Sequence, residues 1–204
     1  MIPTVVLPIT DAQSIPTAQE VIARGGVVVF PTDTLYGLAC DFRNIQAIEK
    51  VYAAKGRSAS KALPVLISDS TQFNELVLTP DQFAHRLMSR YWPGPLTIVL
   101  PKIAGLPYNL TPYPGLAVRM PAHPFALKLL SITGPLAVTS ANLSDHPSPH
   151  SAQEVLEQLS GRVDLVLDGG SLAPSPGSTI IDCTTAEPKL LRAGPLDFEQ
   201  IIKK

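Results

Sequence analysis

The chain is poor in cysteine, in aromatic residues and in net charge of either sign. Cys40 and Cys183 are its only cysteines and stand far apart, so the sequence has neither a CxxC pair nor a disulfide framework. We therefore expect a reducing, cytoplasmic location. Lys and Arg total 16 against 17 Asp and Glu, a formal net charge of −1. General polyanion binders are usually basic, so this balance weighs against that class.

Long apolar runs are also missing. The longest, such as 27–30 and 96–100, have the length of strands, far below the roughly 20 residues that cross a bilayer. The N-terminal segment MIPTVVLPITD has no basic region followed by an apolar one, as a signal peptide would. We expect neither a leader nor a membrane association.

What the chain does have is enough apolar side chains for a full core. Hydrophobic residues make up 45% of 204 residues, which excludes global disorder and suits one domain over 1–204, with its core at about 15–195. Proline is frequent, with 21 residues, and predicts many fixed turns and short elements.

Strand-like and helix-like patterns alternate along the chain. Strands are expected at 27–30, 63–67, 96–101, 116–120, 136–140, 163–167, 178–182 and 189–192, and helices at 18–24, 45–55, 80–91, 125–130, 151–159 and 197–203. Thr17 and Glu20 predict a capping box for the first helix, and Thr79 is expected as N-cap of the third. The strands are mostly apolar on both faces. The predicted fold class is α/β, with a twisted mixed sheet flanked by helices around an open cleft.

Familiar phosphate-binding and catalytic motifs are missing, since the chain has no GxxxxGK(S/T), GxGxxG, HExxH or GxSxG. Polar residues instead follow the apolar strands, where ligands bind in open α/β sheets. They are Thr34, Lys55, Arg57, Lys61, Arg119, Ser140, Asn142, Ser148, Ser178 and Arg192. Five cations on one cleft would suit a polyphosphate together with a carboxylate. Taken singly, each residue also has an ordinary explanation as a solvated helix end, an edge-strand charge, a cap or a turn.

Eight segments among these positions carry a resemblance to a known family. They are FPTDTLYGL, KGRSASK, WPGPLT, LAVRMPAHP, PLAVTSAN, DGG, STIID and LLRAGP, in this order. Together they resemble the YrdC-like family, the threonylcarbamoyl-AMP synthases, from about Ala18 to Pro195. The resemblance implies the YrdC-like fold in its short, single-domain form.

The resemblance also implies an activity. Members of the family combine L-threonine, bicarbonate and ATP, with Mg²⁺ accompanying the nucleotide, into L-threonylcarbamoyladenylate and pyrophosphate. Threonylcarbamoyl-transferase proteins then pass the group to adenosine 37 of tRNAs that read ANN codons, and tRNA itself is at most a weak partner of the synthase.

Site residues follow from the same resemblance. Threonine contacts are expected from Thr34, Arg119, Val138 and Ser178. ATP contacts are expected from Arg57, Lys61, Ser140, Asn142, Ser148 and Arg192. Lys55 and Arg57 are expected to be catalytic, and no side chain is assigned to a metal. The chain departs from many relatives at Ser58, where they have proline, and from some at Leu66, where a histidine contacts threonine.

Two other functions stay open at this point. Related domains have been regarded as double-stranded-RNA binders, although a net charge of −1 argues against strong autonomous binding. The chain could also be a family paralogue without synthase activity, or a carbamoyl-transferring relative. The intact KGR and SAN segments favour the synthase.

Overall fold

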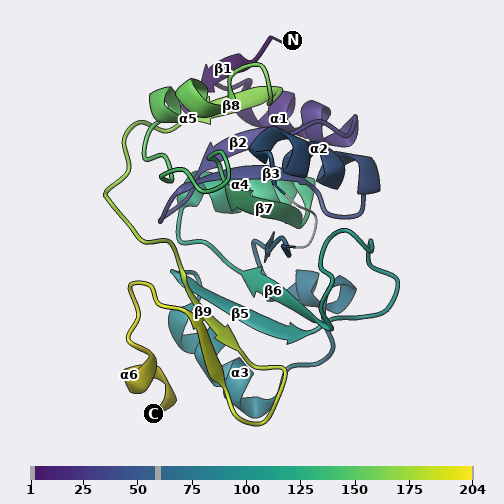
Figure 1. Cartoon of the computed structure of the whole chain (residues 1–204), viewed down its shortest axis with the longest axis vertical. Coiled ribbons are helices and arrows are strands. Elements are labelled where there is room, and N and C mark those ends of the chain that lie inside the picture. The colour runs from purple at the N-terminus through teal and green to yellow at the C-terminus, as the bar shows by residue number, and fades with distance from the viewer. Residues whose placement is uncertain (1–2, 58–60, 204) are drawn as a thin grey trace.

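A single mixed β-sheet runs the length of the molecule (Figure 1). The computed structural model describes residues 3–57 and 61–203. The strands are β1 (Val5–Pro8), β2 (Val28–Pro31), β3 (Tyr36–Asp41), β4 (Val65–Leu66), β5 (Leu96–Pro101), β6 (Gly115–Arg119), β7 (Leu136–Ser140), β8 (Leu165–Asp168), β9 (Thr179–Asp182) and β10 (Lys189–Arg192). Their order in the sheet is β1-β8-β2-β3-β7-β4-β6-β5-β9-β10. Four neighbouring pairs are parallel and five are antiparallel, which confirms the predicted mixed sheet.

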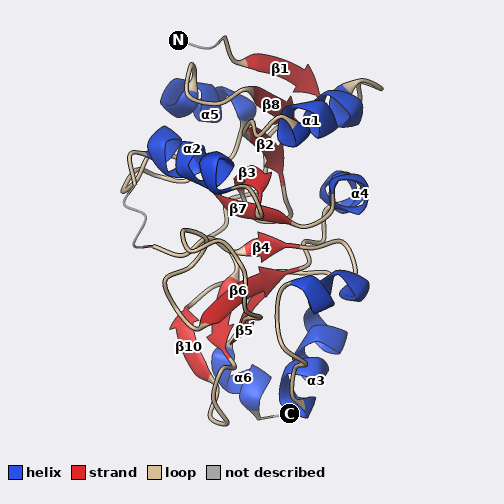
Figure 2. Cartoon of the chain, turned by 90° about the vertical axis from the view of Figure 1, so that its right-hand side faces the viewer, coloured by secondary structure: helices blue, strands red, loops and turns tan. Residues whose placement is uncertain are grey.

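Helices cover the sheet from both sides. They are α1 (Ser14–Ala23), α2 (Ile45–Lys55), α3 (Gln82–Tyr91), α4 (Pro124–Thr133), α5 (Ala152–Leu159) and α6 (Phe198–Ile202), with a short 3₁₀ helix, η1 (Ser70–Glu75). In Figure 2, α2 and α5 lie on one side of the upper strands, and α1 and α4 lie on the other. None of these helices, within the described ranges, is long and apolar enough to cross a membrane.

The two-sided cover explains why the strands lack a polar face. In β2, Val28 and Phe30 pack into the cluster that includes α1 and α4, whereas Val29 packs into the larger cluster with α2 and α5. Successive side chains of a strand point to opposite faces, so both faces of a covered strand must be apolar. The α/β fold class predicted from the sequence is confirmed.

Two predicted helix starts are wrong. Thr17 and Glu20 lie inside α1, whose N-cap is Gln13 and has no side-chain cap bond. The turns before the helix already supply its first backbone hydrogen bonds, so the helix starts earlier than a capping box would require. Helix α3 is capped by Asp81 rather than Thr79, and the Asp81 carboxylate accepts the backbone N–H three residues later. A carboxylate is at least as good an N-cap as a threonine hydroxyl.

The strand predictions differ from the structure at three places. β1 and β3 were not expected, and β4 is reduced from the predicted 63–67 to Val65–Leu66. β3 is central in the sheet, between β2 and β7. Its sequence includes Gly37 and Ala39, which are poor indicators of a strand, and pairing on both edges overrides that weak preference.

The end of α2 prepares the site. Gly56 follows the helix in the left-handed conformation, with φ of +59°, and closes it with backbone bonds to Ala53 and Tyr52. Glycine adopts this conformation without steric strain. Arg57, directly after this glycine, therefore leaves the helix beside β7, where it contacts Thr139.

Candidate active site

A cavity of about 300 Å³ lies across the middle of the sheet. Residues of β3, β6, β7 and β10 line it, together with the segment before β9 and the segment after α2. Its lining includes eight of the predicted site residues: Thr34, Arg57, Arg119, Val138, Ser140, Ser148, Ser178 and Arg192. Positions from nearly the whole length of the chain thus meet at one place, as the sequence analysis expected. Lys55, Lys61 and Asn142 are outside this lining.

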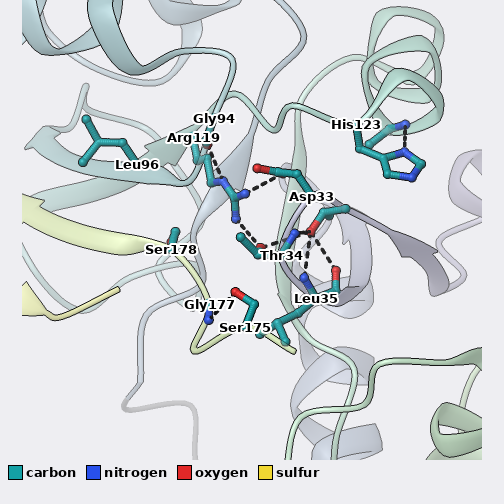
Figure 3. A network of polar contacts seen from close by, with 12 residues as sticks. Asp33, Thr34, Leu35, Gly94, Leu96, Arg119, His123, Ser175, Gly177 and Ser178 are labelled. Atoms are coloured by element: carbon teal, nitrogen blue, oxygen red, sulfur yellow. Dashed lines mark hydrogen bonds and ion pairs between the residues drawn. The ribbon is translucent and has the colours of Figure 1, made fainter. Parts of the chain in front are cut away.

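Arg119, at the end of β6, is buried and held at three points (Figure 3). Its Nε donates to the carbonyl of Gly94 at 3.0 Å, and its Nη1 donates to the Thr34 hydroxyl at 2.8 Å. Nη2 forms an ion pair with the Asp33 carboxylate at 2.6 Å. These contacts fix the orientation of the guanidinium within the fold itself.

Asp33 was missed by the sequence analysis. It stands beside Thr34 in the segment PTDT, and the only signal in the sequence was an acidic residue next to a candidate hydroxyl. Burial lowers the pKa of Arg119, while the charge of Asp33 and its hydrogen bond raise it. The pair therefore keeps the guanidinium charged in a place where burial alone disfavours charge.

Arg192 and Ser178 form a second connected group in the cavity. Arg192 donates from Nε to the carbonyl of Ser178 at 2.9 Å and from Nη2 to its hydroxyl at 3.0 Å. The Ser178 hydroxyl is also within 2.6 Å of the Thr97 hydroxyl. The antiparallel pairing of β9 with β10 brings Arg192 back beside the start of β9. Three segments separated in sequence thereby present one cation and two hydroxyls together.

Lys55 lies behind the cavity wall. Its Nζ donates to the carbonyls of Ser140 and Asn142, each at 2.6 Å, and to Asn142 Oδ1 at 3.0 Å. The Ser140 hydroxyl donates to the same Oδ1 at 2.5 Å. Burial, followed by the nearby charges of Arg57 and Lys61, lowers the pKa of Lys55 to about 7. Three acceptor oxygens offset the cost of a buried charge, and the lysine fixes the loop that presents Ser140.

Four further positions from the sequence analysis are Arg57, Lys61, Leu66 and Ser58. Arg57 reaches Thr139 with Nη1 at 3.1 Å, while its buried Nε has no hydrogen-bond partner among the residues that the structure describes. Lys61 is exposed, and its carbonyl accepts a hydrogen bond from Tyr52. Leu66 lines the cavity as an apolar side chain, and Ser58 lies outside the described residues.

Three cationic side chains and a set of hydroxyls lie together at the centre of the mixed sheet of an α/β protein, an arrangement whose chemistry suits an anion. The family model named Sua5_yciO_yrdC, with the description "Telomere recombination", matches residues 20–194. The chain belongs to this Sua5/YciO/YrdC family.

Individual relatives agree with this assignment. A Pyrococcus abyssi protein named threonylcarbamoyl-AMP synthase is 42% identical over 184 residues, which is 89% of this chain and 54% of that protein. A Bacillus subtilis protein of the same name is 40% identical over 195 residues, 94% of this chain and 56% of that protein. The chain thus spans just over half the length of these curated relatives.

A solved structure from P. abyssi has a similar fold. The crystal structure described as P. abyssi Sua5 complexed with L-threonine superposes with a TM-score of 0.90 at 39% identity. The match covers all of this chain and 60% of that one. The YrdC-like fold is therefore confirmed for this chain.

Proposed function

We propose that this protein is a threonylcarbamoyl-AMP synthase, which makes L-threonylcarbamoyladenylate from L-threonine, bicarbonate and ATP and releases pyrophosphate. The observation that carries the proposal is a single cavity lined by Arg57, Arg119 and Arg192 together with the hydroxyls of Thr34, Ser140 and Ser178. The names of its relatives, and the threonine complex of one of them, support the same reaction.

The amino acid would occupy the end of the cavity that Arg119 forms. A planar guanidinium matches a planar carboxylate, and two of its five N–H groups are not used by Gly94, Thr34 or Asp33. Thr34, Ser178 and Val138 also line the cavity and are the proposed contacts of the threonine side chain and amine. Leu66 gives this region an apolar wall, suited to the threonine methyl group.

ATP would occupy the part of the cavity near Arg57 and Arg192. Ser140 and Ser148 line the same cavity, and exposed Lys61 follows Arg57 by four positions. Asn142 and Lys55 support the Ser140 loop from behind, so their proposed contribution to ATP use is through this loop. Arginines suit phosphate oxygens because they donate two parallel hydrogen bonds.

In the proposed chemistry no protein nucleophile is needed. The threonine amine attacks CO₂, derived from bicarbonate, and loses a proton to give N-carboxythreonine. A carboxylate oxygen of this carbamate then forms a bond to the α-phosphorus of ATP, the bond from that phosphorus to the β-phosphate oxygen breaks, and pyrophosphate leaves. The cavity contributes the positions of the reactants and positive charge for the phosphoryl transition state.

Mg²⁺ belongs to this proposal as a companion of ATP. In nucleotide sites it is held largely by phosphate oxygens and water, with one or two carboxylates. Within residues 3–57 and 61–203, no three His, Cys, Asp or Glu side chains stand close enough to hold a metal ion by themselves. We therefore assign Mg²⁺ as an ion that would arrive bound to the nucleotide and neutralise part of the phosphate charge.

The test is pyrophosphate release from ATP in the presence and absence of threonine and bicarbonate. Release should require both, because threonine offers no carbamate until it has captured CO₂. Arg119 would hold the amino acid's own carboxylate away from the α-phosphorus. Full activity in degassed, CO₂-free buffer, with threonyl-AMP as the product, would contradict the proposal.

The wider context is part of the same proposal. The product would be consumed by threonylcarbamoyl-transferase proteins that modify adenosine 37 of ANN-decoding tRNAs, in the cytoplasm. One continuous sheet, whose strands lie between Val5 and Arg192, supports a single domain over 1–204 with its core at about 15–195. Addition of the purified transferase proteins and tRNA to the assay tests whether the adenylate is passed on.

A further inference from the structure

The three arginines of the cavity do not have the same electrostatic surroundings. Arg119 is paired with the Asp33 carboxylate at 2.6 Å, and both side chains are largely buried. Arg57 and Arg192 instead donate to Thr139 and to Ser178. Among residues 3–57 and 61–203 neither has a carboxylate within ion-pair distance, and the six residues outside those ranges include no Asp or Glu.

Asp33 acts on the cavity from behind. It is absent from the cavity lining, whereas its neighbours Thr32 and Thr34 are part of it. Figure 3 shows its carboxylate on the far side of the Arg119 guanidinium from Ser178, toward His123. A ligand in the cavity would therefore meet Arg119 and Thr34, while the charge of Asp33 cancels part of the arginine's field.

This arrangement divides the cavity into two electrostatic parts. At the Arg119 end the protein's charges sum to zero, but the guanidinium still has N–H groups to donate. Near Arg57 and Arg192 no carboxylate of the described residues forms an ion pair, and the charge of Asp145 acts on Arg57 only from beyond ion-pair distance. Charges interact more strongly inside a protein than in water, so a neutral pair attracts a polyphosphate far less than a lone guanidinium does. A zwitterionic amino acid, which has no net charge, loses little from this neutrality.

We propose that Asp33 is a specificity-determining residue that sorts the two substrates, by keeping polyphosphate away from Arg119 and so reserving that arginine for the amino acid. The proposal rests on the proposed function, since it assumes that an amino acid and a nucleoside triphosphate share the cavity. Asp33 acts through Arg119 and is a positioning residue in this sense, with no contact to the substrate of its own.

The test uses inorganic pyrophosphate as the polyanion probe. Calorimetry would measure threonine binding to the purified protein with and without pyrophosphate, for the parent and for Asp33→Asn. Asparagine can still accept the hydrogen bond from Arg119 but removes the negative charge. In the parent, pyrophosphate should leave threonine affinity unchanged. In Asp33→Asn, pyrophosphate should compete with threonine and lower its apparent affinity roughly tenfold or more.

Two controls separate the role of charge from that of structure. Glu157→Gln removes one carboxylate from the exposed face of α5 and should behave like the parent. Asp33→Glu keeps the charge on a longer side chain, so threonine affinity should fall, but pyrophosphate should still not compete with threonine. Thermal unfolding establishes that each variant is folded. If Asp33→Asn does not fold, the parent and Asp33→Glu still test the proposal. Competition between pyrophosphate and threonine in either of them overturns it.

The outcomes also distinguish this inference from the proposed function. If the parent binds no threonine, the proposed function fails. A titration with pyrophosphate alone then still tests the effect of Asp33 on Arg119, because Asp33→Asn should gain a pyrophosphate site that the parent lacks. If the parent binds threonine and Asp33→Asn shows no competition, the proposed function stands and the sorting role of Asp33 is overturned.

Discussion

Arg119 is the residue whose removal should affect amino-acid binding most directly. We predict that Arg119→Ala weakens threonine binding by about 2–5 kcal/mol, the usual cost of truncating one partner of a buried charge pair. The reason is its burial together with N–H groups that are not used by Gly94, Thr34 or Asp33. Calorimetry of the folded variant measures its affinity for threonine.

The matched control is Arg43→Ala, since Arg43 is an exposed arginine that pairs with Glu75 and neither residue lines the cavity. Unchanged affinity in Arg119→Ala would contradict the assignment.

Lys55 should matter through the loop it holds. We predict that Lys55→Met, which keeps most of the side-chain volume, removes the Lys55 donor from the carbonyls of Ser140 and Asn142 and from Asn142 Oδ1, which keeps the Ser140 hydroxyl. The protein should lose about 1–3 kcal/mol of stability. Threonine-dependent pyrophosphate release should be lost, because Ser140 is no longer held. Denaturant unfolding and the synthase assay measure the two effects.

The control for this prediction lies on the same helix. Lys50 donates a single bond, to the carbonyl of Gly25, so Lys50→Met should retain activity. Equal activity in the two variants would show that the Lys55 ammonium is dispensable.

At the scale of single residues, the sequence predicted the cations better than their partners. An arginine in an otherwise apolar strand stands out without any structure, and Arg119 was identified in this way. Asp33 could not be found, because it is 86 positions from Arg119 and only the fold brings the two side chains together. Lys55 was predicted to be catalytic, and that role stays a prediction. Its bonds to the Ser140 loop depend on a turn that no spacing in the sequence reveals.

Among the elements, the approach of the segment after β10 to β9 leaves no room for a side chain. A Cβ on Gly194 would lie 2.3 Å from the backbone nitrogen of Thr179 and 2.6 Å from the carbonyl carbon of Ser178. We predict that Gly194→Ala forces these segments apart and displaces Ser178 and Arg192. Stability should fall by more than about 2 kcal/mol, as in other cases of steric overpacking.

Gly105→Ala is the comparison for this substitution. Gly105 has a positive φ of +86° but open space around its Cβ position, so alanine there should cost only the backbone strain of roughly 1 kcal/mol. Both values come from denaturant unfolding. A Gly194→Ala variant as stable as Gly105→Ala would show that the segment can move away without loss.

Element prediction succeeded where a pattern was local. The helices predicted at 45–55 and 151–159 correspond to α2 and α5, since the patterns behind both predictions depend on residues close in sequence. β3 and β1 depend on partners from other parts of the chain. Tyr36 pairs with Pro31, but the other edge of β3 pairs with β7, about a hundred residues later. The order of the ten strands was likewise beyond reach of the sequence alone.

For the whole molecule, a ligand in the cavity should link the upper and lower strands of the sheet. The cavity lining includes Ser140 at the end of β7 and Arg192 in β10, which lie in different halves of the sheet order. A ligand that binds only the folded state at 100 times its Kd adds about 2.7 kcal/mol of stability. We predict that ATP with threonine raises the Tm by roughly 5–10 °C, given about 2–4 °C per kcal/mol at this size.

Thermal unfolding with each ligand alone and with both together provides the measurement. The Arg192→Ala variant should lose most of the shift caused by ATP while keeping the shift caused by threonine. An equal loss of both shifts would contradict the division of the cavity into two subsites.

The pairing of β8 with two early strands has a consequence for how the protein is made. Leu165 is the register partner of both Val5 and Val28, so β1 and β2 are joined only through a strand near the end of the chain. On the ribosome, one edge of β2 stays unpaired until β8 has been synthesised and has left the exit tunnel. At about 5–20 residues per second, that interval is on the order of ten seconds. During it the nascent chain exposes an apolar strand edge, which is the kind of surface that chaperones bind.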